Sequence, residues 1–436
     1  MVIFVAFAMK FPVYAMGAGI CSLGLFPFTW GLQTGMSYTL FADESVLILY
    51  LLAFPFLYLV TNRVWQPGFM NLYIALGVLV CTLGVSLAAA PDIFAVRTFL
   101  STFGIGVLLL VLFLQEGSNS NPEETGEFVV WIIVLVAALS LIERVVQRNP
   151  FVEHTPLYMS AEFVRINHGA YRPYVSFFHP SETGAVMAVG NPFVLRAWPR
   201  RRSLLSLLCV GIVAAAILVN ATRGVWVGLF VAALVAVSGV RNARKWLSML
   251  LALAIAAGTS GYLMLRNAPF FQRLSDPTDL YERLHTWVVA AQLLLAHPLF
   301  GIGSFNLVKA YVEFTGDSKG GFTADNMFVS TLAETGLLGF VSFVTILALS
   351  LALLRRYRKD LAAYGLSVES SFVRCTELAL ICYIFTGCFA DTQSFRKLAK
   401  FIFILIGLGL AQGAYVLRST ETRPKAWSGI CKRALT

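Results

Sequence analysis

Long apolar runs, separated by short polar connectors, recur along almost the whole chain. Twelve such runs fall at 6–30, 46–61, 71–90, 93–115, 127–142, 180–197, 203–219, 224–240, 246–265, 326–353, 372–389 and 398–418. A helix needs about 20 apolar residues to cross the roughly 30 Å hydrocarbon core of a bilayer, so these runs predict transmembrane helices. Only 13% of the 436 residues are charged, against about 25% in soluble domains. The sequence therefore predicts an all-α polytopic membrane protein with about 12 transmembrane helices.

Basic residues predict the orientation, because Lys and Arg collect in the short cytoplasmic connectors of membrane proteins. Four basic groups follow the sixth, eighth, tenth and last runs, at 200–202, 241–245, 355–359 and 418–433. These groups share the cytoplasmic side if both termini are cytoplasmic. The net charge of +10 therefore predicts contact with membrane lipids and no binding of nucleic acid.

The same orientation places four connectors on the external side, at 143–179, 220–223, 266–325 and 390–397. We divide the chain into N-terminal helices with an external loop, a core that contains the large loop, and C-terminal helices with a basic tail. These parts cover residues 1–179, 180–353 and 354–436.

Two segments depart from a plain transmembrane helix. The run at 180–197 contains Glu182, Asn191 and Pro192, which predicts a broken helix that faces protein and not lipid. The large loop has apolar residues on one helical face, which predicts an amphipathic helix at the membrane surface. These residues are Leu284, Trp287, Val288, Ala291, Leu294 and Leu295.

Two external arginines, Arg223 and Arg283, are candidates for a functional role, and the charge rule does not explain Arg223. Arg223 lies in a short turn near the bilayer, where an ionisable residue is a functional candidate; alternatively, it extends to lipid phosphates. Arg283 follows Asp279 at a helical spacing, so an exposed ion pair also explains it. In a functional role, either guanidinium would hold phosphate oxygens in a bidentate manner.

Two carboxylates lie near the start of the run at 326–353, Asp325 just before it and Glu334 within it. Asp325 would serve as the N-cap of that helix, or as a general base if local burial tuned its affinity for a proton. Glu334 lies deeper within the apolar run, where a carboxylate must be paired or protonated. Arg223 is its candidate partner, and we favour a structural pair over direct catalysis for Glu334.

Other polar residues have an ordinary explanation beside the functional one. His179 and His297 both precede proline, which is typical of turn residues. Arg144, Arg148, Arg165 and Arg172 make the 143–179 loop basic, as a solvated loop or as a docking surface for an anionic glycan or lipid phosphate. The five histidines and seven cysteines show no metal-ligand or redox spacing. The sequence therefore predicts no metal and no cofactor.

Three motifs in the second half resemble the bacterial O-antigen ligase and O-antigen polymerase family of polytopic membrane glycosyltransferases. The first is Ala-Thr-Arg223-Gly-Val-Trp-Val-Gly. The second combines Arg283-Leu-His-Thr-Trp287 with His297-Pro-Leu-Phe-Gly-Ile-Gly303. The third combines Asn326-Met-Phe with Ala333-Glu-Thr-Gly-Leu-Leu-Gly339. The resemblance covers about 180–345. Ligases of the family usually carry His immediately before that Asn, where this chain has Asp325, which favours a polymerase or exopolysaccharide branch.

The resemblance implies a multi-pass enzyme of the bacterial inner membrane with its active site on the periplasmic side. The donor would be a glycan on undecaprenyl diphosphate, and the acceptor would be a polysaccharide or a lipid. Asp325, Arg223 and Arg283 would be catalytic, with substrate-binding residues around them. We place Arg172, His179, His297, Asn326 and Glu334 in that second set. Ligation to lipid A-core, a transporter or flippase of lipid-linked glycan, and a membrane scaffold remain as alternatives.

Overall fold

The computed structural model describes residues 31–34, 38–41, 67–89, 102–116, 121–149, 166–201, 203–220, 222–238, 278–316, 324–392 and 396–421, apart from a few single positions within these ranges. The runs predicted at 6–30, 46–61 and 246–265 lie outside the described residues, as does most of the basic tail.

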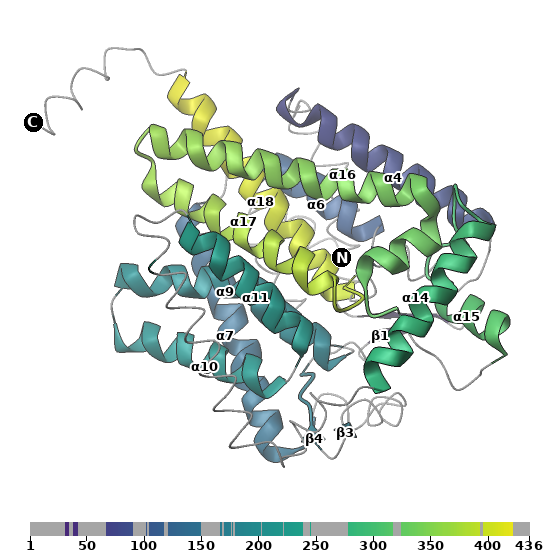
Figure 1. Cartoon of the computed structure of the whole chain (residues 1–436). Coiled ribbons are helices and arrows are strands. Elements are labelled where there is room, and N and C mark those ends of the chain that lie inside the picture. Colours follow the sequence, from purple (N-terminus) through teal and green to yellow (C-terminus); the bar gives the residue numbers. More distant parts are fainter. Residues whose placement is uncertain are drawn as a thin grey trace, which may run out of the picture.

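The described chain is a bundle of α-helices (Figure 1). They are α4 (Met70–Ala89, preceded by the 3-10 helix η1, Pro67–Phe69), α6 (Ile105–Glu116), α7 (Pro122–Val146), α9 (Pro180–Arg201), α10 (Leu204–Asn220), α11 (Arg223–Ser238), α14 (Thr278–Ala296), α15 (Leu307–Thr315), α16 (Met327–Ala363), α17 (Ser367–Gly387) and α18 (Arg396–Glu421). Every predicted apolar run within the described residues coincides with or overlaps one of them.

Among the described residues, three helices are long and apolar enough to cross a membrane: α7, α16 and the Lys397–Ser419 part of α18. A run of about 20 apolar residues inside a helix matches the thickness of the hydrocarbon core. The chain is therefore a membrane protein, while the count of 12 spans and their orientation stay predictions.

The described residues confirm the all-α class and add two short hairpins to it. β1 (Gly31–Thr34) pairs antiparallel with β2 (Tyr38–Phe41), so that Gly31 lies opposite Phe41. β3 (Ile166–Asn167) pairs antiparallel with β4 (Ala170–Tyr171) inside the 143–179 loop. Both pairs are local hairpins, which a periodicity search over long apolar runs does not detect.

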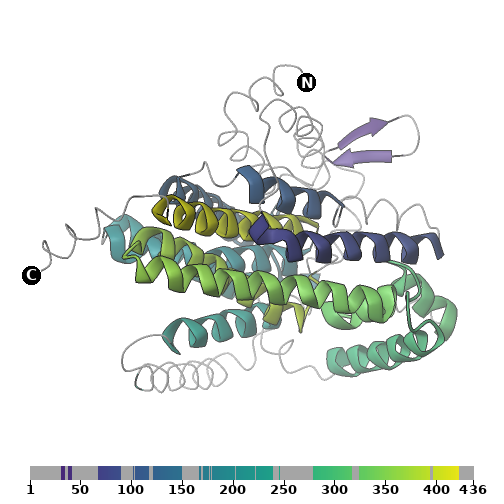
Figure 2. The same ribbon diagram turned by 90° about the horizontal axis from the view of Figure 1, so that it is seen from above.

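The core lies where α16, α17 and α18 pack together, with α6 against α18 and α11 against α17. Large apolar side chains such as Phe343, Phe372 and Phe193 are buried there. Seen from above, α14 and α15 lie beside one end of α16, away from the bundle axis (Figure 2). The helix predicted in the large loop is thus confirmed as α14, while its place at the membrane surface stays a prediction.

One end of the bundle gathers the connectors that the sequence placed on the external side, and we call it the site end. Glu182 at the start of α9 accepts a hydrogen bond from the backbone N–H of Lys397 at the start of α18 (2.8 Å). The Thr392 hydroxyl donates to Met327 Sδ (2.9 Å) at the start of α16. At the other end, which we call the basic end, Arg196 donates to the carbonyl of Val368 (3.0 Å).

The helix break occurs in a different place from the prediction. α9 is one continuous helix despite Pro192, whose carbonyl accepts a hydrogen bond from the Cys375 thiol (3.4 Å). The break lies instead in α16 at Gly336, where φ is 65° and ψ is −170°. The sequence signal for α9 was its polar content, but Glu182 is satisfied by the N-terminus of α18 and does not interrupt the helix.

Candidate functional site

The break in α16 is filled by the loop that follows α14. The N–H groups of Ile302 and Gly303 donate to the carbonyls of Ala333 and Glu334 (both 3.0 Å). On the other side of the break, the N–H of Leu337 donates to the carbonyl of Pro298 (2.9 Å). Backbone groups that a broken helix leaves unpaired must find partners when no water is available. The second and third sequence motifs thus form one interlocked unit, which we call the joint (residues 297–303 and 333–339).

Two glycines make this close fit achievable. Gly336 adopts a backbone conformation that is essentially restricted to glycine. A Cβ atom at Gly336 would collide with the backbone carbonyl of Leu299, and one at Gly301 would collide with the backbone of Glu334. The joint therefore fixes the first turns of α16 relative to α14.

Arg283 of α14 and Asp325, just before α16, form an ion pair. Arg283 Nη2 lies 3.0 Å from Asp325 Oδ2, and the two side chains are 30% and 42% exposed. Arg283 Nη1 also donates to the carbonyl of Phe389 (3.2 Å), just beyond α17. The partner of Arg283 thus comes from another element, and the Asp325 side chain is half-exposed in this pair.

Asn326, and not Asp325, caps α16. Asn326 Oδ1 accepts hydrogen bonds from the N–H groups of Phe328 (2.9 Å) and Val329 (3.2 Å). Asp325 has a φ of 45°, a left-handed conformation that Asp tolerates better than most residues. The prediction that Asp325 is the N-cap is wrong by one residue, and its carboxylate points to Arg283 instead.

Arg223 begins α11 next to the same segment of α17. A Cβ atom at Gly224 would lie 2.8 Å from Phe389 Cβ, and one at Gly228 would overlap the side chain of Thr386. Small residues four apart allow two membrane helices to approach closely. The glycines of the first motif therefore bring the start of α11, with the half-buried Arg223, against the residue whose carbonyl binds Arg283.

Arg172 is a buried positioning side chain and not part of a solvated loop. It is only 3% exposed. Its Nε donates to the carbonyl of Asn220 (3.2 Å), and Nη2 donates to the Thr222 hydroxyl (3.0 Å) and to Ser181 Oγ (3.3 Å). These contacts hold the turn that immediately precedes Arg223.

The loop that carries Arg172 is itself anchored to the end of α7. Glu143 accepts hydrogen bonds from the Tyr171 hydroxyl (2.8 Å) and from the N–H of Val175 (2.6 Å). Arg144 donates to the carbonyl of Tyr171 (2.6 Å). Glu143 supports this loop structurally and was not predicted to do so, although a carboxylate at the end of an apolar run was an available sequence signal.

Glu334 lies inside the joint. Its carboxylate accepts a hydrogen bond from the N–H of Leu307 at the start of α15 (3.2 Å), where the helix dipole favours a negative charge. Asp391 is close enough to interact with it electrostatically. The hydrogen bond goes to α15 and not to Arg223, so the suggested pair across the bundle is replaced by a helix-terminus contact.

The two histidines are local. His179 Nδ1 accepts a hydrogen bond from the N–H of Ser181 (3.1 Å) at the start of α9. His297 is exposed, and its backbone closes α14 and opens the joint. These contacts are local and do not involve the Arg283–Asp325 pair. They agree with the interpretation of both histidines as turn residues.

Two buried lysines of α18 were also missed. Lys397 is 3% exposed and stacks on the Phe177 ring, 5.1 Å from its centre, while Lys400 is fully buried. The sequence signal for them was a pair of lysines at the start of a long apolar run.

Across the described residues, no group of three or more His, Cys, Asp or Glu side chains could hold a metal ion.

Comparison with known families identifies the segment that carries this site. No curated protein matches the chain. Residues 207–344 match the family described as O-antigen ligase, and this segment contains Arg223, Arg283, Asp325 and the whole joint. Residues 207–344 are therefore similar to the O-antigen ligase family, which is the resemblance that the three motifs indicated.

Proposed function

We propose that this protein is a membrane glycosyltransferase of the polymerase type, acting on the periplasmic face of the bacterial inner membrane. It would transfer a glycan from an undecaprenyl-diphosphate donor to a hydroxyl of an acceptor glycan. The observation that carries the proposal is the Arg283–Asp325 ion pair of 3.0 Å at the site end, beside the start of α11. A base and two guanidinium groups are what such a transfer requires.

The reaction needs a proton acceptor and a place for negative charge. The acceptor hydroxyl oxygen attacks the anomeric carbon of the donor, and its proton passes to the Asp325 carboxylate. The bond between that carbon and the diphosphate oxygen breaks, and undecaprenyl diphosphate leaves with the electron pair. Attack opposite to the leaving group inverts the anomeric centre. Arg223 and Arg283 stabilise the charge that develops on the diphosphate.

Donor binding would change the partner of Arg283. Both of its terminal nitrogens are engaged, one by Asp325 and one by the carbonyl of Phe389. A diphosphate offers guanidinium a bidentate and more highly charged partner than a single carboxylate. Its arrival would release Asp325 to face the acceptor hydroxyl, so the base becomes available only when the donor is in place.

Glycan length tests this proposal directly. We would reconstitute the protein with a lipid-linked repeat unit and compare wild type with Asp325→Ala. Long polymer from wild type and single repeats on the carrier from the variant are expected. Asp360→Ala, a half-exposed carboxylate of α16 at the basic end that is paired with Arg356, is the matched control and should behave as wild type.

The other outcomes identify the alternatives. In cells that supply long polymer on the carrier, polymer that stays on the carrier in Asp325→Ala but is transferred from it by wild type would indicate a ligase, as in transfer to lipid A-core. Movement of the lipid-linked unit across the membrane without any lengthening would indicate a flippase. Wild-type polymer from Asp325→Ala would exclude Asp325 as the base.

A further inference from the structure

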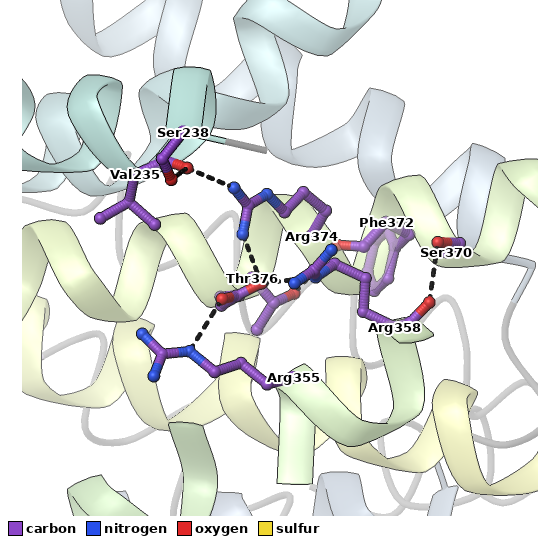
Figure 3. A network of polar contacts seen from close by, with 9 residues as sticks. Val235, Ser238, Arg355, Arg358, Ser370, Phe372, Arg374 and Thr376 are labelled. Atoms are coloured by element: carbon purple, nitrogen blue, oxygen red, sulfur yellow. Dashed lines mark hydrogen bonds and ion pairs between the residues drawn. The ribbon is translucent and has the colours of Figure 1, made fainter. Parts of the chain in front are cut away.

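Three arginines converge on one buried carboxylate near the basic end (Figure 3). The Glu377 side chain of α17 is 1% exposed. It lies 3.1 Å from Arg355 Nε, 2.9 Å from Arg358 Nε and 2.7 Å from Arg374 Nη1. Removing a charge from water is expensive unless partners surround it. One arginine would neutralise Glu377, so the cluster carries an excess of two positive charges.

The three arginines differ in how many of their guanidinium nitrogens contact other groups of the protein. Arg374 is fully engaged, because Nη1 binds Glu377 and Nη2 donates to the carbonyl of Val235 in α11 (2.7 Å). Arg355 and Arg358 approach Glu377 only through Nε. Among the residues that the structure describes, the Nη atoms of Arg355 and Arg358 have no hydrogen-bond partner.

These two guanidinium forks remain accessible. The Arg355 side chain is 49% exposed and the Arg358 side chain is 30% exposed. Both lie near the end of α16, where the apolar run gives way to Arg355, Arg356, Arg358 and Lys359. Exposed tyrosines stand at the same end, Tyr364 just after α16 and Tyr415 on α18. Aromatic and basic residues together mark the level of lipid headgroups in membrane proteins.

We propose that Arg355 and Arg358, held on Glu377, form a binding site for the phosphate of an anionic phospholipid headgroup. Glu377 accepts a hydrogen bond from Arg355 Nε and attracts Arg358 Nε as an ion pair, and the Nη atoms of both arginines then present their donors to phosphate oxygens, a geometry that suits bidentate contact. Basic pockets between transmembrane helices are known to hold anionic headgroups in this way. The site joins α11, α16 and α17 at the end of the bundle remote from the Arg283–Asp325 pair.

The test compares the purified full chain in nanodiscs of phosphatidylcholine alone with nanodiscs that also contain phosphatidylglycerol. A ligand that binds only the folded state raises the unfolding temperature. We expect phosphatidylglycerol to raise this temperature for wild type. Native mass spectrometry should show retained phosphatidylglycerol, and Arg355→Gln or Arg358→Gln should weaken that retention about tenfold.

The matched control is Arg356→Gln, because Arg356 is 75% exposed and pairs only weakly with Asp360 (3.8 Å). It removes the same charge from the same turn and should retain phosphatidylglycerol as wild type does. Each variant is compared between the two lipids, so a general loss of stability cancels. Equal loss in Arg356→Gln, or no lipid-dependent shift in wild type, would overturn the proposal. Equal stabilisation by inorganic phosphate in phosphatidylcholine discs would instead identify a site for free phosphate.

Discussion

Asp325 and Asn326 are neighbours in the sequence and have separate tasks in the structure. Asn326 turns its side chain inward to cap α16, and Asp325, in a left-handed conformation, turns outward to Arg283. A carboxylate can both cap a helix and pair with an arginine, so residue type alone did not show which of the two neighbours is the N-cap of α16. The left-handed backbone at Asp325 thus accompanies the separation of the ion pair from the helix cap.

Arg223→Ala and Arg283→Ala should each lower the rate of glycan lengthening about 100-fold or more, because each removes a donor for the leaving diphosphate. Arg283→Lys should retain part of the rate, since lysine keeps the charge but loses the bidentate fork. The measurement is the rate of polymer formation at equal amounts of inserted protein. Full activity in either alanine variant would remove that arginine from the mechanism, and Arg356→Ala serves as the control for a lost surface charge.

The joint is the element on which the site geometry depends. The loop at 297–303 satisfies the backbone groups that the break at Gly336 leaves open, and Ser86 of α4 adds a hydrogen bond to the carbonyl of Glu334 (2.7 Å). A break of this kind would be costly inside a membrane if it were unfilled. The joint thereby connects α4, α14 and α16 and positions Asp325 opposite Arg283.

Gly336→Ala should destabilise the protein by more than the roughly 1–3 kcal/mol that such a sparsely populated backbone conformation alone costs a residue other than glycine. The added Cβ atom would also collide with Leu299. The control is Gly365→Ala, which has a φ of 75° but open space around its Cβ position. Thermal unfolding in detergent would measure both variants. Equal losses would show that the joint is not tightly packed.

At the scale of the whole molecule, the two ends differ in character. The site end gathers the family motifs, the ion pair and the turn held by Arg172. The basic end carries Arg196, the Glu377 cluster and the arginines of α16. This polarity agrees with the positive-inside rule, by which the basic end would be cytoplasmic.

Cysteine labelling tests that orientation in a background from which the native cysteines have been removed. Phe314→Cys in α15 and Tyr364→Cys after α16 introduce thiols at exposed positions of the two ends. A membrane-impermeant thiol reagent should label Phe314→Cys in cells whose inner membrane is intact. Tyr364→Cys should be labelled only after that membrane is permeabilised. The reverse pattern would invert the topology and place the site on the cytoplasmic side.

Length, hydropathy and residue type are local properties, so the membrane-protein class, the described α-helices other than α15 and the three motifs could be predicted from the sequence. It also singled out Arg223, Arg283 and Asp325. The pairing of Arg283 with Asp325, the capping role of Asn326 and the burial of Arg172 became visible only in the folded chain. Phe389, whose carbonyl binds Arg283, had no sequence signal, since any residue offers a carbonyl. The helix break was predicted in α9 and is found at Gly336 of α16 for the same reason. Whether a polar or broken segment is stable depends on partners that are distant in the chain.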